Sequence, residues 1–282
     1  MTTAPSTVQH ALTWAQTLGL PRLEAQMLLL HALGRPLNDR AWLLMHDQSA
    51  LQADTHQHFA HAVQRRLATE PVAYITGVKE FFGLHLQVDA RVLDPRADTE
   101  TLVEWALSCL ADVPTPQVVD LGTGSGAIAL ALKHSRPDAH VHAVDASTDA
   151  LAVAQANATQ LGLEVRFHEG SWLSPFDASM KFDAIVSNPP YIASADAHLA
   201  ALTHEPLSAL ASGTDGLDDL RAIVSQAGQH LQPGGWLLLE HGYDQAQAVQ
   251  DLLGNAGFTQ VQSHADLAGI LRCSGGRWPT VK

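Results

Sequence analysis

The sequence predicts an α/β protein with a doubly wound, mainly parallel sheet, preceded by a small N-terminal helical domain and a β-hairpin linker. Three observations support this fold class. Apolar residues repeat at helical spacing over residues 6–70, and the spacing changes to strand-like alternation within residues 72–93. From residue 118 onward, short apolar runs alternate with longer helical runs, as in strands joined by crossover helices.

Residues 1–71 are expected to form a helical bundle. Val8, Leu12 and Ala15 share one helical face until Gly19 interrupts the run. Three further helical stripes cover residues 23–30, 40–46 and 51–67. Such stripes usually form a core, and a small bundle before a catalytic domain also suits the binding of a substrate protein.

Residues 72–95 are expected to form the β-hairpin linker. Apolar and polar side chains alternate over residues 84–88, which indicates a strand with one buried face. The larger domain is expected over residues 96–282. Its first helix has Asp98 or Thr99 in position to act as the N-cap.

A glycine-rich turn follows the strand expected over residues 118–121. The turn reads Gly122-Thr123-Gly124-Ser125-Gly126, and an alanine-rich helical run comes next. Glycines let the backbone approach a ligand, and a helix N-terminus attracts a carboxylate or phosphate. The next strand ends at Asp145, where an acid usually accepts ribose hydroxyls. This order indicates a nucleotide-type site, in which Asp120 either orients the turn or contacts the ligand.

A double proline ends another apolar run, residues 182–187. The segment that follows is Asn188-Pro189-Pro190-Tyr191, in which each proline sets its own φ at about −65° and keeps the preceding residue extended. The Asn188 side-chain oxygen and a backbone carbonyl are suited to accept the N–H groups of an amide or aromatic amine, and Tyr191 to stack on its flat face. Such a nitrogen is a poor nucleophile, so positioning must carry its reaction.

The remaining elements complete the alternation. Helices are expected over residues 148–161, 217–231 and 244–254, and strands over 165–168, 236–240 and 258–263. Ligands of parallel sheets bind outside the carboxyl ends of the strands. Gly122, Asp145, Trp172 and Asn188 all fall near such ends, so we expect them at one site, although Trp172 is also typical of a core position.

Composition restricts the class of protein. The 282 residues are 46% hydrophobic, which suffices for a large core, and 16 basic against 29 acidic residues give a net charge of −13, which opposes broad binding to nucleic acid. Cys109 and Cys273 match no metal spacing and the histidines are scattered, so we expect free thiols, no metal and a cytoplasmic setting. The segment after Met1 is not expected to act as an export signal, and no apolar run is long enough for a membrane span.

Several motifs resemble those of one family along almost the whole chain. They occupy residues 24–34, 71–77, 80–83, 92–100, 122–126, 188–192, 205–206, 238–242 and 266–269. The glycine turn resembles the first motif of S-adenosylmethionine-dependent methyltransferases, and Asn-Pro-Pro-Tyr also occurs in DNA and RNA amino-methyltransferases. Arg96-Ala97-Asp98-Thr99-Glu100 beside the hairpin narrows the resemblance to the HemK/PrmC family, the N5-glutamine methyltransferases of peptide chain release factors.

This resemblance implies a class I methyltransferase fold. It also implies methyl transfer from S-adenosyl-L-methionine to the side-chain nitrogen of the glutamine in the Gly-Gly-Gln motif of release factors. The implied cofactor residues are Gly122, Thr123, Gly124, Ser125, Gly126, Asp145, Trp172 and Asn188. The implied substrate residues are Asn188, Pro189, Pro190 and Tyr191, and of these Asn188, Pro189 and Tyr191 are the expected catalytic residues. We expect a monomer whose partners are release factors, with no direct nucleic-acid contact.

Two alternatives stay open at this point. A DNA or RNA amino-methyltransferase acting on a flipped base would use the same motif, although the acidic balance and the lack of a basic, aromatic-rich segment oppose it. A scaffold protein that has lost activity is opposed by the intact motifs. Asp94 stands where the family has an apolar residue, and residues 192–205 look shortened. These departures are expected to affect the linker and the substrate loop.

Overall fold

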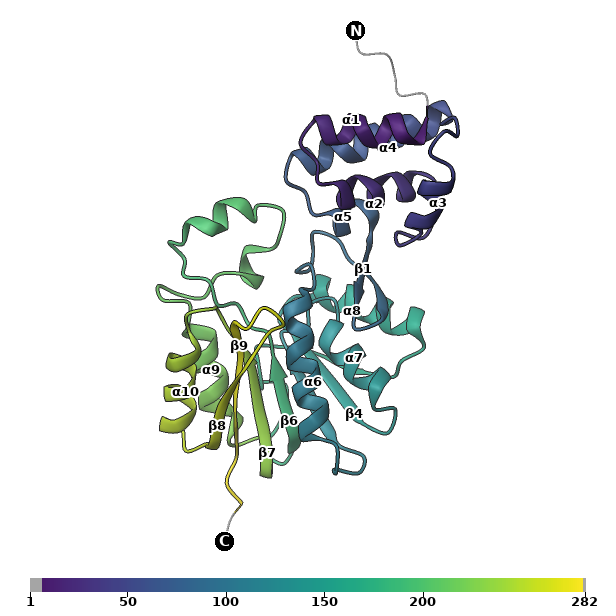
Figure 1. The fold of residues 1–282 in the computed structure, drawn as a ribbon. Coiled ribbons are helices and arrows are strands. Elements are labelled where there is room, and N and C mark those ends of the chain that lie inside the picture. Colours follow the sequence, from purple (N-terminus) through teal and green to yellow (C-terminus); the bar gives the residue numbers. More distant parts are fainter. Residues whose placement is uncertain (1–6, 281–282) are drawn as a thin grey trace. The chain divides into compact units, whose positions relative to one another are not determined.

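The chain divides into two units, Met1–Val78 and Lys79–Lys282, in the computed structural model (Figure 1). The structure describes residues 7–280. The opening residues from Met1, which were considered for an export signal, lie outside the described part.

The first unit is helical, as the apolar stripes predict. Its helices are α1 (Val8–Thr17), α2 (Arg22–Ala32), α3 (Arg40–Met45), α4 (Ala53–Leu67) and α5 (Val72–Thr76). Leu28, Leu29 and Phe59 are fully buried in a shared apolar core, which gives this unit a hydrophobic interior of its own. An ion pair between Arg66 and Glu24, 2.7 Å from Nε to Oε2, joins α4 to α2.

The hairpin occupies less of residues 72–95 than the sequence suggested. Its strands are β1 (Val78–Phe81) and β2 (Leu84–Gln87), while Val72–Thr76 form α5 instead. Pro71 precedes this helix with a φ of −56°, and Gly77 ends it in the left-handed region with a φ of 73°. Pro71 and Gly77 are ordinary start and stop signals of a helix. The β-branched side chains between these two residues favoured a strand in the sequence prediction.

A seven-stranded sheet forms the centre of the second unit. Its strands are β3 (Gln117–Leu121), β4 (His140–Asp145), β5 (Arg166–Glu169), β6 (Phe182–Ser187), β7 (Leu231–Glu240), β8 (Thr259–Ala265) and β9 (Leu271–Arg277), in the order β5-β4-β3-β6-β7-β9-β8. The first five strands in that order run parallel, and β9 is antiparallel to both neighbours. The prediction of a mainly parallel sheet is confirmed.

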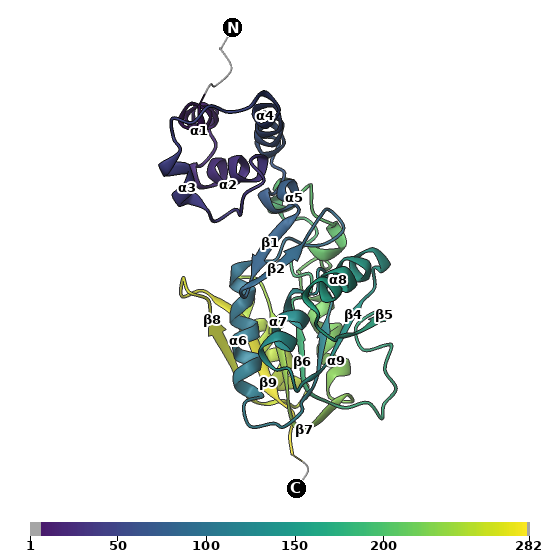
Figure 2. The ribbon, with the colours of Figure 1, turned by 90° about the vertical axis from the view of Figure 1, so that its right-hand side faces the viewer.

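Helices cover both faces of this sheet (Figures 1 and 2). They are α6 (Glu100–Cys109), α7 (Ala127–Ser135), α8 (Thr148–Leu161), α9 (Asp218–Ala227) and α10 (Ala246–Asn255), with short 3-10 turns at Ala197–Ala201 (η2), Leu207–Ala209 (η3) and Ala97–Thr99 (η1). Leu220 of α9 and Val249 of α10 pack with Val119 in one buried cluster. Ala129 of α7 packs with Val141 in another, so the winding is double as expected.

The strand β9 was absent from the sequence prediction. It lies between β7 and β8 although it follows both in the chain. Gly275 and Gly276 lie within it, next to its last residue Arg277, and glycine is normally unfavourable in a strand. At Gly275 a Cβ atom would lie 2.6 Å from the Leu237 carbonyl oxygen and 2.8 Å from the Trp105 ring, so a close approach requires the glycine.

Asn157 of α8 joins the hairpin to the glycine turn. Its Nδ2 donates to the carbonyl oxygens of Gln87 and Ser125 at 3.0 and 2.9 Å, and its Oδ1 accepts from the Gln87 N–H at 2.7 Å. The side chain is fully buried, so each of these polar groups has its partner within the protein. Figure 2 shows the hairpin beside α8.

The structure bears on two expectations from composition, which concern membrane-spanning helices and the two cysteines. Across the described range 7–280, no helix is both long and apolar enough to cross a membrane. Cys109 is half-buried and Cys273 is buried, and both are free thiols.

Candidate functional site

A cavity of ≈ 440 Å³ lies at the carboxyl ends of β3, β4, β5 and β6. The residues that line it are Arg91, Val92, Leu93, Gly122, Gly124, Asp145, Ala146, Ser147, Ala150, Gly170, Ser171, Trp172, Asn188, Pro190, Pro206, Ser208, Ala209 and Asp219. Gly122, Asp145, Trp172 and Asn188, which the sequence places after four different strands, therefore meet at one cavity. Parallel strands bring their carboxyl ends to one edge of a sheet, and this brings the four residues together.

The glycine turn forms one wall of the cavity. Gly122 has a φ of 70°, and a Cβ atom there would lie 3.4 Å from the Trp172 ring. Gly126 caps α7 with a φ of 85°, and a Cβ there would lie 3.0 Å from Leu130 and 3.2 Å from Ala154. The first glycine therefore leaves room at the cavity, while the second lets α7 and α8 pack closely.

Asp120 orients this turn from beneath. Its side chain is fully buried, and its Oδ2 accepts from the Thr123 hydroxyl at 2.6 Å and from the Ala129 N–H at 3.2 Å. Burial raises the pKa of the Asp120 carboxyl to about 7, against the effect of those hydrogen bonds. Of the two roles left open for Asp120, the structure favours orientation of the turn.

Asp145 presents a carboxylate to the cavity. Its Oδ2 accepts from the Gly124 N–H and its Oδ1 from the Ser147 N–H, both at 2.9 Å. These bonds fix the carboxylate, while each oxygen keeps a further lone pair for a ligand hydroxyl. Trp172 lines the cavity next to the glycine turn and offers a flat apolar surface. A glycine cradle, a fixed acid and an aromatic wall fit a nucleoside with a charged tail, as S-adenosylmethionine has.

Asn188 and Pro190 line the same cavity from the end of β6. The Asn188 Nδ2 donates to the Thr99 Oγ1 at 3.2 Å. Tyr191 is oriented differently, because its hydroxyl donates to the buried Glu240 Oε1 at 3.4 Å and its ring packs against the core under α9 and α10. Burial raises the pKa of the Tyr191 hydroxyl. Its stacking role therefore stays a prediction.

Five of the predicted site residues do not line the cavity. In the described part of the chain, the residues that line the cavity do not include Thr123, Ser125, Gly126, Pro189 or Tyr191. Thr123 bonds Asp120, and the Ser125 carbonyl accepts from Asn157. Pro189 is buried. No described contact tests a direct role for these residues in binding or catalysis.

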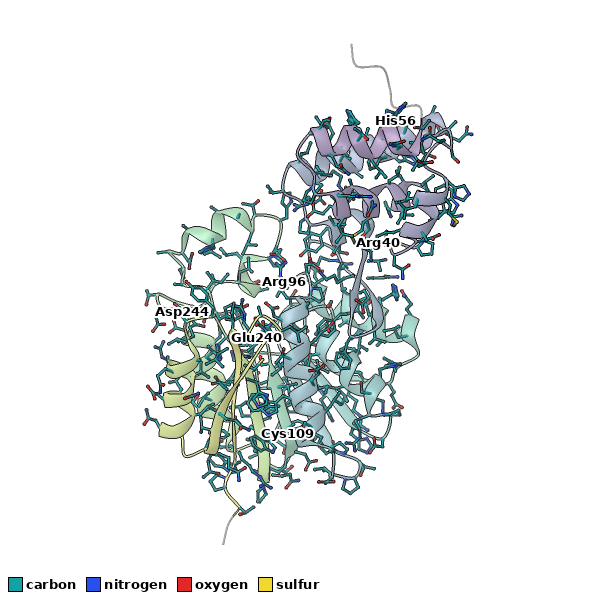
Figure 3. The ribbon with its side chains drawn as sticks, viewed as in Figure 1. Arg40, His56, Arg96, Cys109, Glu240 and Asp244 are labelled. Carbon is teal, nitrogen blue, oxygen red and sulfur yellow. The ribbon has the colours of Figure 1, made fainter. Side chains whose placement is uncertain are left out.

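Ion pairs join two further segments that line the cavity. Nη2 of Arg96 lies 2.7 Å from both carboxylate oxygens of Glu205, whose side chain is 2% exposed. Asp94 pairs with Lys79, at 3.1 Å from Nζ to Oδ1, and its N–H donates to Glu205. Figure 3 shows Arg96 and Glu240 at the same end of the sheet, with Cys109 near the far end of α6. Asp94, expected to affect the linker, thus belongs to a network beside the cavity.

The role of Thr99 was missed in the sequence. We expected Asp98 or Thr99 to cap α6, but the Thr99 side chain makes no capping hydrogen bond and contacts Asn188 instead. The Arg-x-Asp-Thr-Glu segment marked the family resemblance, and this was the one signal available. No local pattern connects residues 89 positions apart.

Comparisons with known proteins cover almost the whole chain. A family profile described as the methyltransferase small domain matches residues 98–215, and one described as the PrmC N-terminal domain matches residues 8–77. The release factor glutamine methyltransferase of Bordetella pertussis is 50% identical over 260 residues, which cover 92% of this chain and 95% of that protein. The enzyme of that name from Burkholderia pseudomallei is 47% identical, over 92% and 93%.

Solved structures show the same fold at lower identity. A methyltransferase from Pyrococcus furiosus superposes with a TM-score of 0.54 at 18% identity, over 79% of this chain and all of that chain. The 16S rRNA N2 G1207 methyltransferase of Thermus thermophilus, in complex with AdoMet and guanosine, gives 0.52 at 21%, over 71% and 49%. The fold of the second unit is that of class I S-adenosylmethionine methyltransferases.

Proposed function

We propose that the cavity of this protein brings S-adenosylmethionine and the glutamine of a Gly-Gly-Gln motif together. The reason is that the chain belongs to the release factor glutamine methyltransferase family. The protein is an S-adenosylmethionine-dependent methyltransferase of release factor glutamine. The single observation that carries the assignment of residues is that the glycine turn, Asp145 and Asn188 line one cavity.

The cofactor residues follow from the walls of this cavity. Gly122 and Gly124 leave space along the turn for the charged tail of the cofactor. The fixed Asp145 carboxylate accepts the ribose hydroxyls, and Trp172 packs on the adenine. When bound, S-adenosylmethionine supplies an electrophilic methyl group on a sulfonium.

Asn188 holds the acceptor amide in this proposal. Because its Nδ2 donates to Thr99, its Oδ1 is the atom left to accept an N–H of the glutamine side chain. A backbone carbonyl in the segment 188–191 accepts the second N–H, and Pro190 bounds the space. The two hydrogen bonds hold both N–H groups of the amide and so fix the direction of the lone pair on its nitrogen. A delocalised amide requires such positioning. No side chain is needed as a base before attack.

The experiment is methyl transfer from labelled S-adenosylmethionine. Purified release factor, the same factor with alanine in place of the Gly-Gly-Gln glutamine, and duplex DNA are assayed in parallel. We expect label on the intact factor alone. Label on the alanine variant at the level of the parent, or on DNA, would reject the assignment.

The helical first unit is proposed to bind the body of the release factor. The support is an apolar surface on α3, where Leu44 and Met45 are 67% and 73% exposed. Exposed apolar side chains that lie next to each other commonly mark a protein contact.

We further propose that the protein acts as a monomer in the cytoplasm. Its two free thiols support a reducing compartment. Its acidic composition supports a low affinity of the protein for nucleic acid. Light scattering of the purified chain tests the monomer, and fractionation of cells tests the compartment.

A further inference from the structure

Asn188 makes a hydrogen bond that leads away from the cavity. Its Nδ2 donates to the Thr99 Oγ1 at 3.2 Å, and Thr99 is only 4% exposed. The carboxyl of Glu240, which is 1% exposed, lies near the Thr99 side chain. Tyr191 reaches the same carboxyl from the opposite end of the Asn-Pro-Pro-Tyr segment, at 3.4 Å from its hydroxyl to Oε1.

The direction of the Asn188–Thr99 hydrogen bond follows from the chemistry of each group. An amide nitrogen only donates, so Thr99 must accept from Asn188. The contact therefore places the Asn188 nitrogen against Thr99 and leaves the Asn188 oxygen for the cavity, which Asn188 lines.

We propose that Thr99 is a positioning residue that keeps the Asn188 amide oxygen turned toward the acceptor nitrogen. This inference rests on the proposed function, in which Asn188 accepts from the glutamine. Thr99 touches neither substrate nor cofactor in it. Its effect is confined to the orientation of one side chain, so it should appear in the turnover of bound substrate.

The matched variants are Thr99→Val, which keeps the shape and removes the hydroxyl, and Thr99→Ser, which keeps the hydroxyl. With full-length protein and an intact release factor, we expect Thr99→Val to lower kcat roughly 10- to 100-fold, from the loss of one buried hydrogen bond and the orientation it enforces. The KM for the release factor and the affinity for S-adenosylmethionine by calorimetry should change less than about twofold. Thr99→Ser should recover most of the rate, which a loss of packing alone would not explain.

A double-mutant cycle with Asn188→Ala separates positioning from a general loss of structure. If Thr99 acts through Asn188, adding Thr99→Val to Asn188→Ala should cost no more than about twofold in single-turnover rate. An additional loss equal to that in the wild-type background would overturn the inference, as would Thr99→Ser being as slow as Thr99→Val. The wild-type enzyme serves as the separate test of function, because failure of the intact chain to label release factor would reject the proposed function itself.

Discussion

Asn188 has two polar side-chain atoms, and the structure assigns them to different groups. The nitrogen donates to Thr99, and in the proposed function the oxygen accepts from the glutamine amide. Because that proposed contact concerns the acceptor and not the cofactor, substitution of Asn188 should separate the two binding events.

Asn188→Ala should therefore lower the methylation rate by roughly 100-fold or more, similar to the loss of a preorganised transition-state contact. Binding of S-adenosylmethionine, measured by calorimetry, should change little. A collapse of cofactor affinity as large as the loss in rate would place Asn188 at the cofactor instead.

Asp120 makes a prediction about stability. Burial raises its pKa from 3.8 to about 7 in the folded protein, so the folded chain keeps a proton that the unfolded chain loses at lower pH. Its contribution to the free energy of unfolding is therefore complete below about pH 3.8 and is lost as the pH rises to about 7. Urea unfolding of the wild type and Asp120→Asn should show a stability difference that changes across this window and is constant above it. A difference independent of pH would mean that folding does not raise the pKa of Asp120.

Among the strands, β9 was not predicted from the sequence, although it joins β8 to the rest of the sheet. It fills the position between β7 and β8, and its register with β7 pairs Gly275 with Leu238. The approach of α6 over this point explains why a residue without a side chain stands in a central strand.

Gly275→Ala should destabilise the protein by about 1–3 kcal/mol, because the new methyl group meets backbone oxygen and the Trp105 ring within 3 Å. Gly254→Ala is the matched control. Gly254 lies in α10, and an added Cβ there would meet no atom within 4 Å beyond its chain neighbours and the backbone of its own helix. Alanine should therefore be neutral at this position or stabilise the helix by up to about 1 kcal/mol. Equal melting temperatures of the two variants would show that β9 tolerates a side chain there.

For the whole molecule, the division into two units suggests a division of work. The second unit contains every described residue that lines the cavity, and the first has its own core and an exposed apolar surface on α3. Substrate chemistry and substrate docking can then be altered independently.

Leu44→Ser combined with Met45→Ser should raise the KM for an intact release factor by roughly 10-fold, as expected when two exposed apolar anchors of a protein contact are lost. Methylation of a short Gly-Gly-Gln peptide should be unaffected. Leu23→Ser, at another exposed position of the same unit, is the control. Equal losses on protein and peptide, or no loss on either, would contradict the docking role.

Local patterns in the sequence were sufficient to predict most elements and the location of the cavity. Helical stripes, strand alternation, the glycine turn and the Asn-Pro-Pro-Tyr segment depend on residues close together in the chain, and each carries its own chemistry. The rule that parallel strands end at one edge then placed Gly122, Asp145, Trp172 and Asn188 together, and the cavity confirms it.

Only the tertiary structure decided which distant side chains support that site. Thr99 meets Asn188 across 89 positions and Arg96 meets Glu205 across 109, and β9 enters the sheet out of chain order. Such contacts depend on strand order and on how helices pack over the sheet. A periodic pattern records which face of an element is buried, but it does not record which residue of another element will lie against it.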